Sequence, residues 1–163
     1  MPNNEIRVAA VQFGVGEDIG KNLELSLEMI NAASEFRPKL IVLPEFINHC
    51  SWYEDRDHCY SVAIDINGDF INSISEKASE FETYIVINCT VRREKNLVTG
   101  TNILFDQTGK VIAQSDKQVL MGNENNFLKP SDTLGPIINS SIGKLGMFSC
   151  MDGVMPETAR CIA

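Results

Sequence analysis

LIVLPEF, residues 40–46, is a short apolar run that ends at a proline followed by an acid and an aromatic residue. An apolar run of this length, closed by Pro44, predicts a buried strand. IRVAAVQF, residues 6–13, predicts a second buried strand. Between the two runs, apolar residues recur at helical spacing and predict an amphipathic helix over about residues 20–35. This strand–helix–strand order indicates two parallel strands joined by a crossover.

The remaining pattern continues the alternation of strands and helices. It predicts a helix over residues 70–81, a strand over 83–91, a β-hairpin over 102–113 with its turn at 106–109, a strand over 145–149 and a helix from Pro156. Such an order is typical of an α/β fold. With 163 residues, the chain is long enough for one hydrophobic core, and no repeat or linker divides it. We therefore expect a single domain over residues 1–163.

Composition and charge exclude several classes of protein. The net charge of −8 argues against nucleic acid as a partner, because phosphate binding needs a basic surface. No apolar run approaches the roughly 20 residues that span a bilayer, so no membrane partner is expected. The N-terminal segment, residues 1–5, lacks the basic region and apolar core of a secretory signal. A cytoplasmic location is therefore predicted.

Three residues could supply the groups of a nucleophilic enzyme. Glu45 follows a strand, at the edge where α/β sheets bind ligands. Cys150 ends an apolar run and precedes a helix start, which would lower the pKa of its thiol. Taken singly, Glu45 and Lys117 could be solvated and Cys150 could be a core residue. Together they provide a base, a positive charge for a developing oxyanion and a nucleophile.

The two histidines offer alternatives. His49 and His58 lie in a polar segment far in sequence from Cys150, so a cysteine–histidine pair is the weaker hypothesis. With Cys50 and Cys59 they could also form a zinc site. Adjacent histidine and cysteine residues match zinc-ligand spacing poorly, and without a CxxC motif or signal peptide the five cysteines are expected to be reduced.

Four segments resemble one family, in the order in which that family carries them. They are IRVAAVQF (6–13), LIVLPEF (40–46), SDKQVLMGNENNFLKPS (115–131) and GKLGMFSCMDGVMPETAR (143–160). The last three are similar to the glutamate, lysine and cysteine motifs of the nitrilase, or carbon–nitrogen hydrolase, family. The residues after the cysteine look closer to the amidase-like branch. The resemblance covers nearly the whole chain.

This resemblance implies a role for each site residue. Glu45 would be the general base, and Cys150 the nucleophile that forms a thioester. Lys117 and the backbone N–H of Met151 would stabilise the oxyanion, while Glu124 would position the substrate or tune the lysine. The substrate would be a small amide, N-carbamoyl compound or nitrile, with acyl transfer to an amine left open. No metal or other cofactor is implied, and a homo-oligomer is expected.

The resemblance also implies an αββα sandwich, in which two sheets pack face to face with helices outside. Family domains are longer than this chain, which resembles only their N-terminal portion, so the sandwich is expected to be incomplete. The alternative function is therefore an inactive half-domain that acts in assembly or partner binding. Residues 47–60 are expected to border the substrate pocket, with Trp52 and Tyr53 in its wall.

Overall fold

The computed structural model describes residues 5–163. Residues 1–4, which include most of the segment considered above as a secretory signal and the start of the expected 1–163 domain, lie outside the described residues. The helices are α1 (Ile19–Ser34), α2 (Arg56–Val62), α3 (Asp69–Glu80), the 3-10 helix η1 (Glu94–Asn96), α4 (Glu124–Phe127), α5 (Met151–Val154) and α6 (Pro156–Ile162). The strands are β1 (Val8–Ala10), β2 (Leu40–Val42), β3 (Tyr84–Arg93), β4 (Leu97–Phe105), β5 (Val111–Asp116), β6 (Ile138–Ser140) and β7 (Gly143–Leu145).

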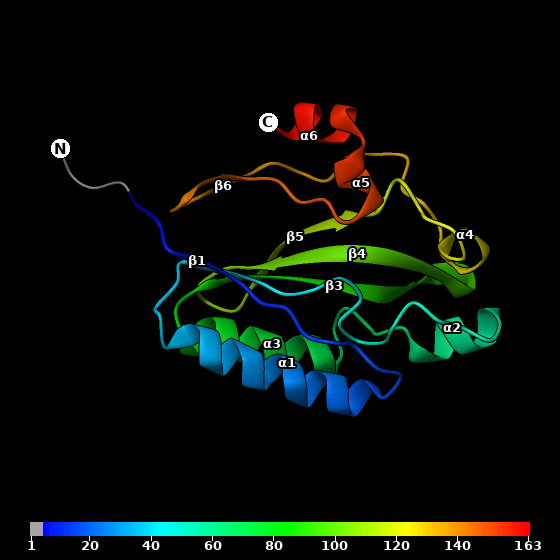
Figure 1. Cartoon of the computed structure of the whole chain (residues 1–163), viewed down its shortest axis with the longest axis horizontal. Coiled ribbons are helices and arrows are strands. Elements are labelled where there is room, and N and C mark those ends of the chain that lie inside the picture. Colours follow the sequence, from blue (N-terminus) through cyan, green and yellow to red (C-terminus); the bar gives the residue numbers. More distant parts are fainter. Residues whose placement is uncertain (1–4) are drawn as a thin grey trace.

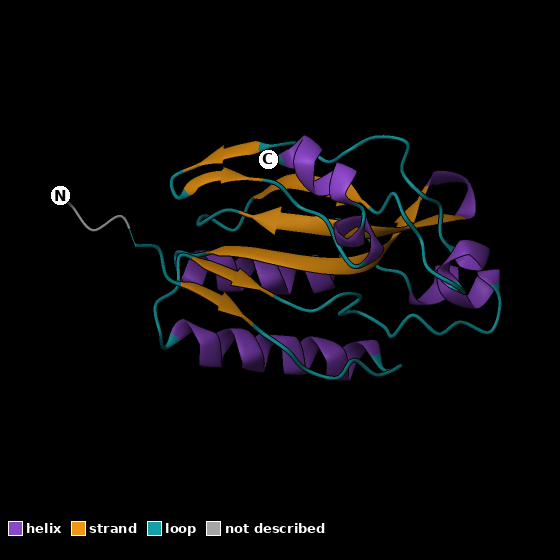
Figure 2. Cartoon of the chain, turned by 45° about the horizontal axis from the view of Figure 1, so that its top comes forward, coloured by secondary structure: helices purple, strands orange, loops and turns teal. Residues whose placement is uncertain are grey.

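Five strands form one sheet in the order β1-β2-β3-β4-β5, and β6 and β7 form a separate antiparallel pair (Figure 2). β1 pairs with β2 and β2 with β3 in parallel, so the predicted crossover between the first two strands is confirmed. β3, β4 and β5 pair antiparallel, which confirms the predicted hairpin. The α/β fold class is therefore confirmed.

The main hydrophobic core lies between this sheet and two helices. α1 and α3 lie side by side along one face of the sheet (Figure 1). Ile30 of α1 and Ile74 of α3 are fully buried against Ile41 and Ile85 of the central strands. The sequence begins α1 with an N-cap, because the Asp18 carboxylate accepts the N–H of Lys21 at 3.0 Å.

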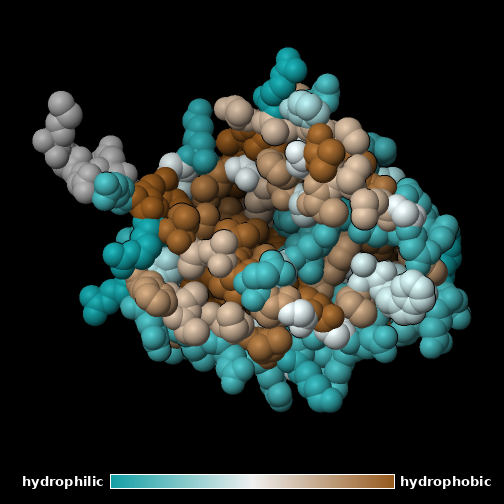
Figure 3. Space-filling view, in the orientation of Figure 1, coloured by the Kyte–Doolittle hydropathy of each residue, from teal (hydrophilic) through white to brown (hydrophobic). Residues whose placement is uncertain are grey.

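The opposite face of the sheet carries the second layer. β6, β7, α5 and α6 lie above that face (Figure 1). Between the layers is an apolar cavity of about 190 Å³, and Figure 3 shows apolar side chains gathered around this hollow. Its walls are Leu40, Val42, Val86 and Leu104 from the sheet and residues 145–148 from the upper layer. Residues 145–150 therefore cross this face of the sheet above its apolar side chains.

Three predicted elements differ from the structure. The strand expected over residues 145–149 is wrong beyond Leu145, where β7 ends, and the Met147 carbonyl accepts from the Ser115 hydroxyl at 3.2 Å rather than from a strand backbone. The first strand is limited to residues 8–10. Residues 47–60, for which no helix was predicted, contain the start of α2, which the Asp55 carboxylate caps by accepting the His58 N–H at 2.8 Å.

Across residues 5–163, every helix is too short or too polar to cross a bilayer.

Candidate active site

Glu45 lies in the turn that follows β2. The backbone of this turn is bonded to β3: Leu43 N–H donates to Val86 O and Ile47 N–H to Asn88 O, both at 2.9 Å. The N–H of Phe46 donates to the Asn88 side-chain oxygen at 3.0 Å, and Phe46 adopts a left-handed φ of 53°. The turn is thus held at the carboxyl end of the parallel strands, as the sequence predicted for Glu45.

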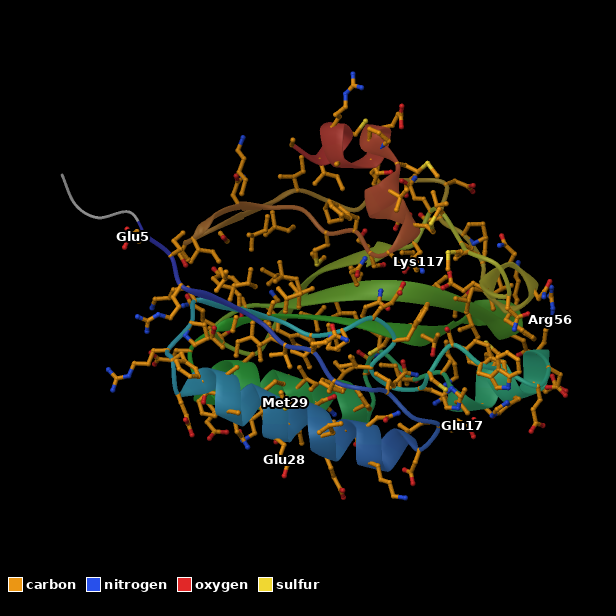
Figure 4. The ribbon with its side chains drawn as sticks, in the orientation of Figure 1. Glu5, Glu17, Glu28, Met29, Arg56 and Lys117 are labelled. Carbon is orange, nitrogen blue, oxygen red and sulfur yellow. The ribbon has the colours of Figure 1, made fainter. Side chains whose placement is uncertain are left out.

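Lys117 follows β5 and is the most deeply buried charged residue of the described chain, with 0% of its side chain exposed. Its Nζ donates to Glu45 Oε1 at 2.5 Å and to Glu124 Oε2 at 2.9 Å. Nζ also lies 4.9 Å from the centre of the Phe46 ring. Burial alone would lower the pKa of Lys117, but the hydrogen bonds and charges of the two glutamates outweigh it and raise the pKa. The lysine is therefore a fixed positive charge between the sheet and α5 (Figure 4).

The end of β5 is built to receive this lysine. The N–H of Lys117 donates to Gly100 O at 2.8 Å, which extends the β4–β5 pairing by one residue. A side chain at Gly100 would place its Cβ 2.9 Å from Lys117 Cδ, so the absence of a side chain at Gly100 leaves room for the lysine stem. Just before Lys117, the Asp116 carboxylate accepts from Arg93 at 2.8 Å and from Thr101 at 2.6 Å.

Glu124 is the first residue of α4 and is 8% exposed. The same oxygen that binds Lys117, Oε2, also accepts the N–H of Met121 at 3.1 Å. The Glu124 carboxylate therefore bonds to two other residues of the segment 117–124, here called the lysine loop, and closes that loop. The structure thus places Glu124 beside Lys117, where the resemblance predicted it.

Cys150 is exposed and ends the segment that crosses the sheet. Its backbone adopts φ 51° and ψ −118°, an unusual conformation for a residue with a side chain, immediately before Met151 begins α5. Burial and the negative charge of Glu45 raise the pKa of the Cys150 thiol, with Lys117 and the Met151 N–H acting in the opposite direction. The predicted lowering of this pKa by a helix N-terminus is therefore wrong. α5 has only four residues, and Glu45 disfavours the thiolate.

Asn88, which the sequence analysis missed, links the turns of Glu45 and Cys150. It is buried in β3, where its oxygen accepts the Phe46 N–H and its amide group donates to Asn102 at 3.0 Å and Ser149 at 3.2 Å. Phe46 follows Glu45 and Ser149 precedes Cys150. An amide side chain in the middle of TYIVINCTV, a run predicted to form a strand, was the signal that could have identified it.

Tyr53 and Trp52, the two residues predicted for the pocket wall, differ widely in exposure. Tyr53 is 4% exposed and packs edge-on against Phe127, with ring centres 5.4 Å apart, in a cluster behind Phe46. Trp52 is 67% exposed. His49 is buried against Tyr53, with ring centres 5.7 Å apart. Both histidines of this segment therefore pack with Tyr53 in an aromatic cluster, and the place of Trp52 and Tyr53 in the pocket wall stays a prediction.

Between Glu5 and Ala163, no group of three or more histidine, cysteine, aspartate or glutamate side chains could hold a metal ion. The groups that converge are a thiol, a carboxylate that both opposes its ionisation and binds an ammonium, and that buried ammonium. These three groups lie together on one face of an α/β sheet. The family model described as carbon-nitrogen hydrolase matches residues 7–163, and the chain belongs to that family.

Known relatives agree with this assignment. Hydrolase C26A3.11 of Schizosaccharomyces pombe is 26% identical over 168 residues, which cover 96% of this chain and 51% of that protein. A nitrilase of Pyrococcus abyssi is 26% identical over 144 residues, covering 88% of this chain and 54% of the relative. The chain thus spans about half the length of the curated relatives it matches.

Solved structures show the same fold. A carbon-nitrogen hydrolase from Helicobacter pylori G27 superimposes with a TM-score of 0.86 at 20% identity, covering 96% of this chain and 55% of that one. An amidase from Nesterenkonia sp. superimposes with a TM-score of 0.82 at 24% identity, covering 95% and 59%. The fold of this chain is therefore the nitrilase fold, as the resemblance implied.

Proposed function

We propose that this chain carries the reaction centre of a thiol hydrolase that cleaves a non-peptide C–N bond in a small amide, N-carbamoyl compound or nitrile. The observation that carries the proposal is the shared carboxylate of Glu45. It binds the Lys117 ammonium at 2.5 Å and raises the pKa of Cys150. A base beside a protonated thiol and a fixed cation is what acyl transfer through a thioester requires.

For an amide, the chemistry follows from these positions. Glu45 takes the proton from Cys150 Sγ as the sulfur attacks the carbonyl carbon. The negative charge that develops on the carbonyl oxygen is stabilised by Lys117 and the Met151 N–H. Glu45 returns the proton to the leaving amine, which leaves a thioester on Cys150. Glu45 then activates a water that hydrolyses the thioester, and Glu124 holds the lysine throughout.

A second candidate is a half-domain that acts in assembly or partner binding. Exposed apolar side chains favour it: Phe148 at 45% and Val42 at 37% exposure line the apolar cavity, and Val8 at 61% lies on β1 opposite Leu40 of the cavity wall. Single-domain folding over residues 1–163, a homo-oligomer and a cytoplasmic location stay predictions. Gel filtration and a substrate panel separate this candidate from the hydrolase, since a half-domain associates without turning over any substrate.

The first test measures iodoacetamide labelling of each cysteine by peptide mapping across neutral and alkaline pH. We expect the labelling of Cys150 to rise at a higher pH than that of an ordinary thiol, because burial and Glu45 raise its pKa. Glu45→Gln removes the negative charge and should move the Cys150 profile to lower pH. Cys161, which is also exposed, is the internal control and should not respond.

The second test measures turnover on a panel of amides, N-carbamoyl compounds and nitriles. Cys150→Ala should abolish any turnover while the circular dichroism spectrum and melting temperature stay close to those of the unmodified chain. Cys161→Ala should leave turnover unchanged. Turnover that survives in Cys150→Ala would sink the proposed mechanism. If the pH profile of Cys150 labelling is the same in Glu45→Gln as in the unmodified chain, the proposed base does not act on the thiol.

A further inference from the structure

We propose that Asp152 is a positioning residue that fixes Cys150 against Lys117, by tying the turn that carries the cysteine to the loop that carries the lysine. The inference rests on the proposed function. It adds a residue that touches none of the reacting groups and sets the distance between two of them.

The Asp152 carboxylate is buried, with 3% of the residue exposed. Its Oδ1 accepts the N–H of Gln118 at 3.1 Å and the N–H of Val119 at 2.8 Å. These are the two residues that directly follow Lys117. Hydrogen bonds to a carboxylate are roughly twice as strong as those between neutral groups. Because the buried Asp152 carboxylate accepts two backbone hydrogen bonds there, it fixes the start of the lysine loop.

Asp152 is equally fixed to the cysteine. Its N–H donates to Ser149 O at 3.1 Å, and the Gly153 N–H donates to Cys150 O at 2.9 Å. Residues 149–153 thus form a compact turn, the cysteine turn, in which Asp152 stands two residues after Cys150. Because Cys150 is held at an unusual φ of 51° in this turn, a shift of Asp152 shifts the thiol with it.

With these hydrogen bonds, each of the three segments of the site is bonded to the other two. The segments are the Glu45 turn, the lysine loop and the cysteine turn. Lys117 binds Glu45 directly, and Asn88 joins the Glu45 turn to Ser149. Asp152 supplies the remaining tie, between the cysteine turn and the lysine loop. Without it, the exposed cysteine turn is attached near the site chiefly through Ser149. A misplacement of about 1 Å can cost on the order of a hundredfold in rate.

The test is a cycle of variants read by the pH profile of Cys150 labelling. The quantity measured is the shift of that profile caused by Glu45→Gln, in the unmodified chain and in the Asp152→Ala background. If Asp152 holds Cys150 beside Glu45 and Lys117, the shift shrinks in Asp152→Ala. Asp152→Asn, which keeps one oxygen acceptor without the charge, should give an intermediate shift. Glu157→Ala, at an exposed carboxylate on α6, is the matched control and should leave the shift unchanged.

The outcomes separate this inference from the proposed function. If Glu45→Gln shifts nothing in the unmodified chain, the proposed function fails. If it does shift the profile and the shift is equally large in Asp152→Ala, the positioning role is overturned while the proposed function stands. Should Asp152→Ala not fold, Asp152→Asn decides alone: a reduced shift supports the role, and a full shift overturns it.

Discussion

Lys117 and Cys150 reach the same site from regions of very different construction. Lys117 extends from the five-stranded sheet, is 0% exposed and has both of its carboxylate partners in place. Cys150 is exposed and lies on the upper layer, whose two strands have three residues each. The charge of Lys117 is thus held by the buried sheet, whereas the thiol of Cys150 is held by an exposed layer with two short strands. The geometry of the site depends on how well the second is tied to the first.

The largest expected effect comes from removing the buried charge. Lys117→Met leaves Glu45 and Glu124 facing each other without the ammonium that both bind. Breaking a buried ion pair by removing one partner costs about 3–5 kcal/mol of unfolding free energy. Urea denaturation measures the loss. Lys144→Met, at an exposed position on β7, is the control from the upper layer and should stay within about 0.5 kcal/mol. Equal losses in both variants would contradict the contrast between the two regions.

Removing the tie between the regions is expected to cost less. Asn88→Ala leaves the buried Phe46 N–H and the Asn102 side-chain oxygen without their Asn88 partner and frees Ser149. We expect a loss of about 2–3 kcal/mol, since each buried group left unsatisfied costs about 1–3 kcal/mol. Thermal and urea unfolding check the value. Asn139→Ala, at an exposed asparagine on β6, should cost little. A loss in Asn88→Ala no larger than in the control would mean that the two layers are not joined through Asn88.

Alkaline pH should destabilise the buried region through the thiol of Cys59. Burial raises the pKa of Cys59 from 9.0 to about 11, so the unfolded chain gives up this proton first as the pH rises. The contribution of Cys59 to the free energy of unfolding is therefore fully present below pH 9. It is lost as the pH rises from 9 to about 11, which lowers the free energy of unfolding by about 2 kcal/mol. Cys59→Ala should flatten the fall of stability over that range. Cys161→Ala, at an exposed thiol of the upper layer, should leave the slope as it was.

The sequence predicted what is locally encoded. The strand at residues 40–42, the helix of α1 and the hairpin of β4 and β5 follow from apolar spacing and turn residues, and all three are present. α2 was missed although its N-cap, Asp55, stood in the sequence. Glu45, Lys117 and Cys150 were identified as a set through motif order. Their distances depend on pairings between residues far apart in the chain.

Long-range bonds account for what could not be predicted. Residues 146–149 were predicted to continue a strand, but in the structure of residues 5–163 β7 ends at Leu145, and the side chains of Ser115 and Asn88 bind Met147 and Ser149. The direction of the Cys150 pKa shift depends on Glu45, whose proximity no local pattern encodes. Gln118 and Val119 likewise gave no signal that Asp152 would bind their backbone. In each case the deciding contact crosses between the two regions.

The smallest expected effect tests how tightly the buried region is packed around its lysine. In Gly100→Ala the new Cβ would lie 2.9 Å from Lys117 Cδ and 3.0 Å from Phe46 Cε1, so one of them must move. Overpacking of this kind costs about 1 kcal/mol or somewhat more. Gly14→Ala, where a Cβ meets nothing within 4 Å, is the matched control. If Gly100→Ala costs no more than Gly14→Ala, the lysine stem has room to move. The buried region would then be as adaptable as the exposed turn of Cys150. If the loss appears and the Cys150 labelling profile moves with it, the position of Lys117 is what the thiol responds to.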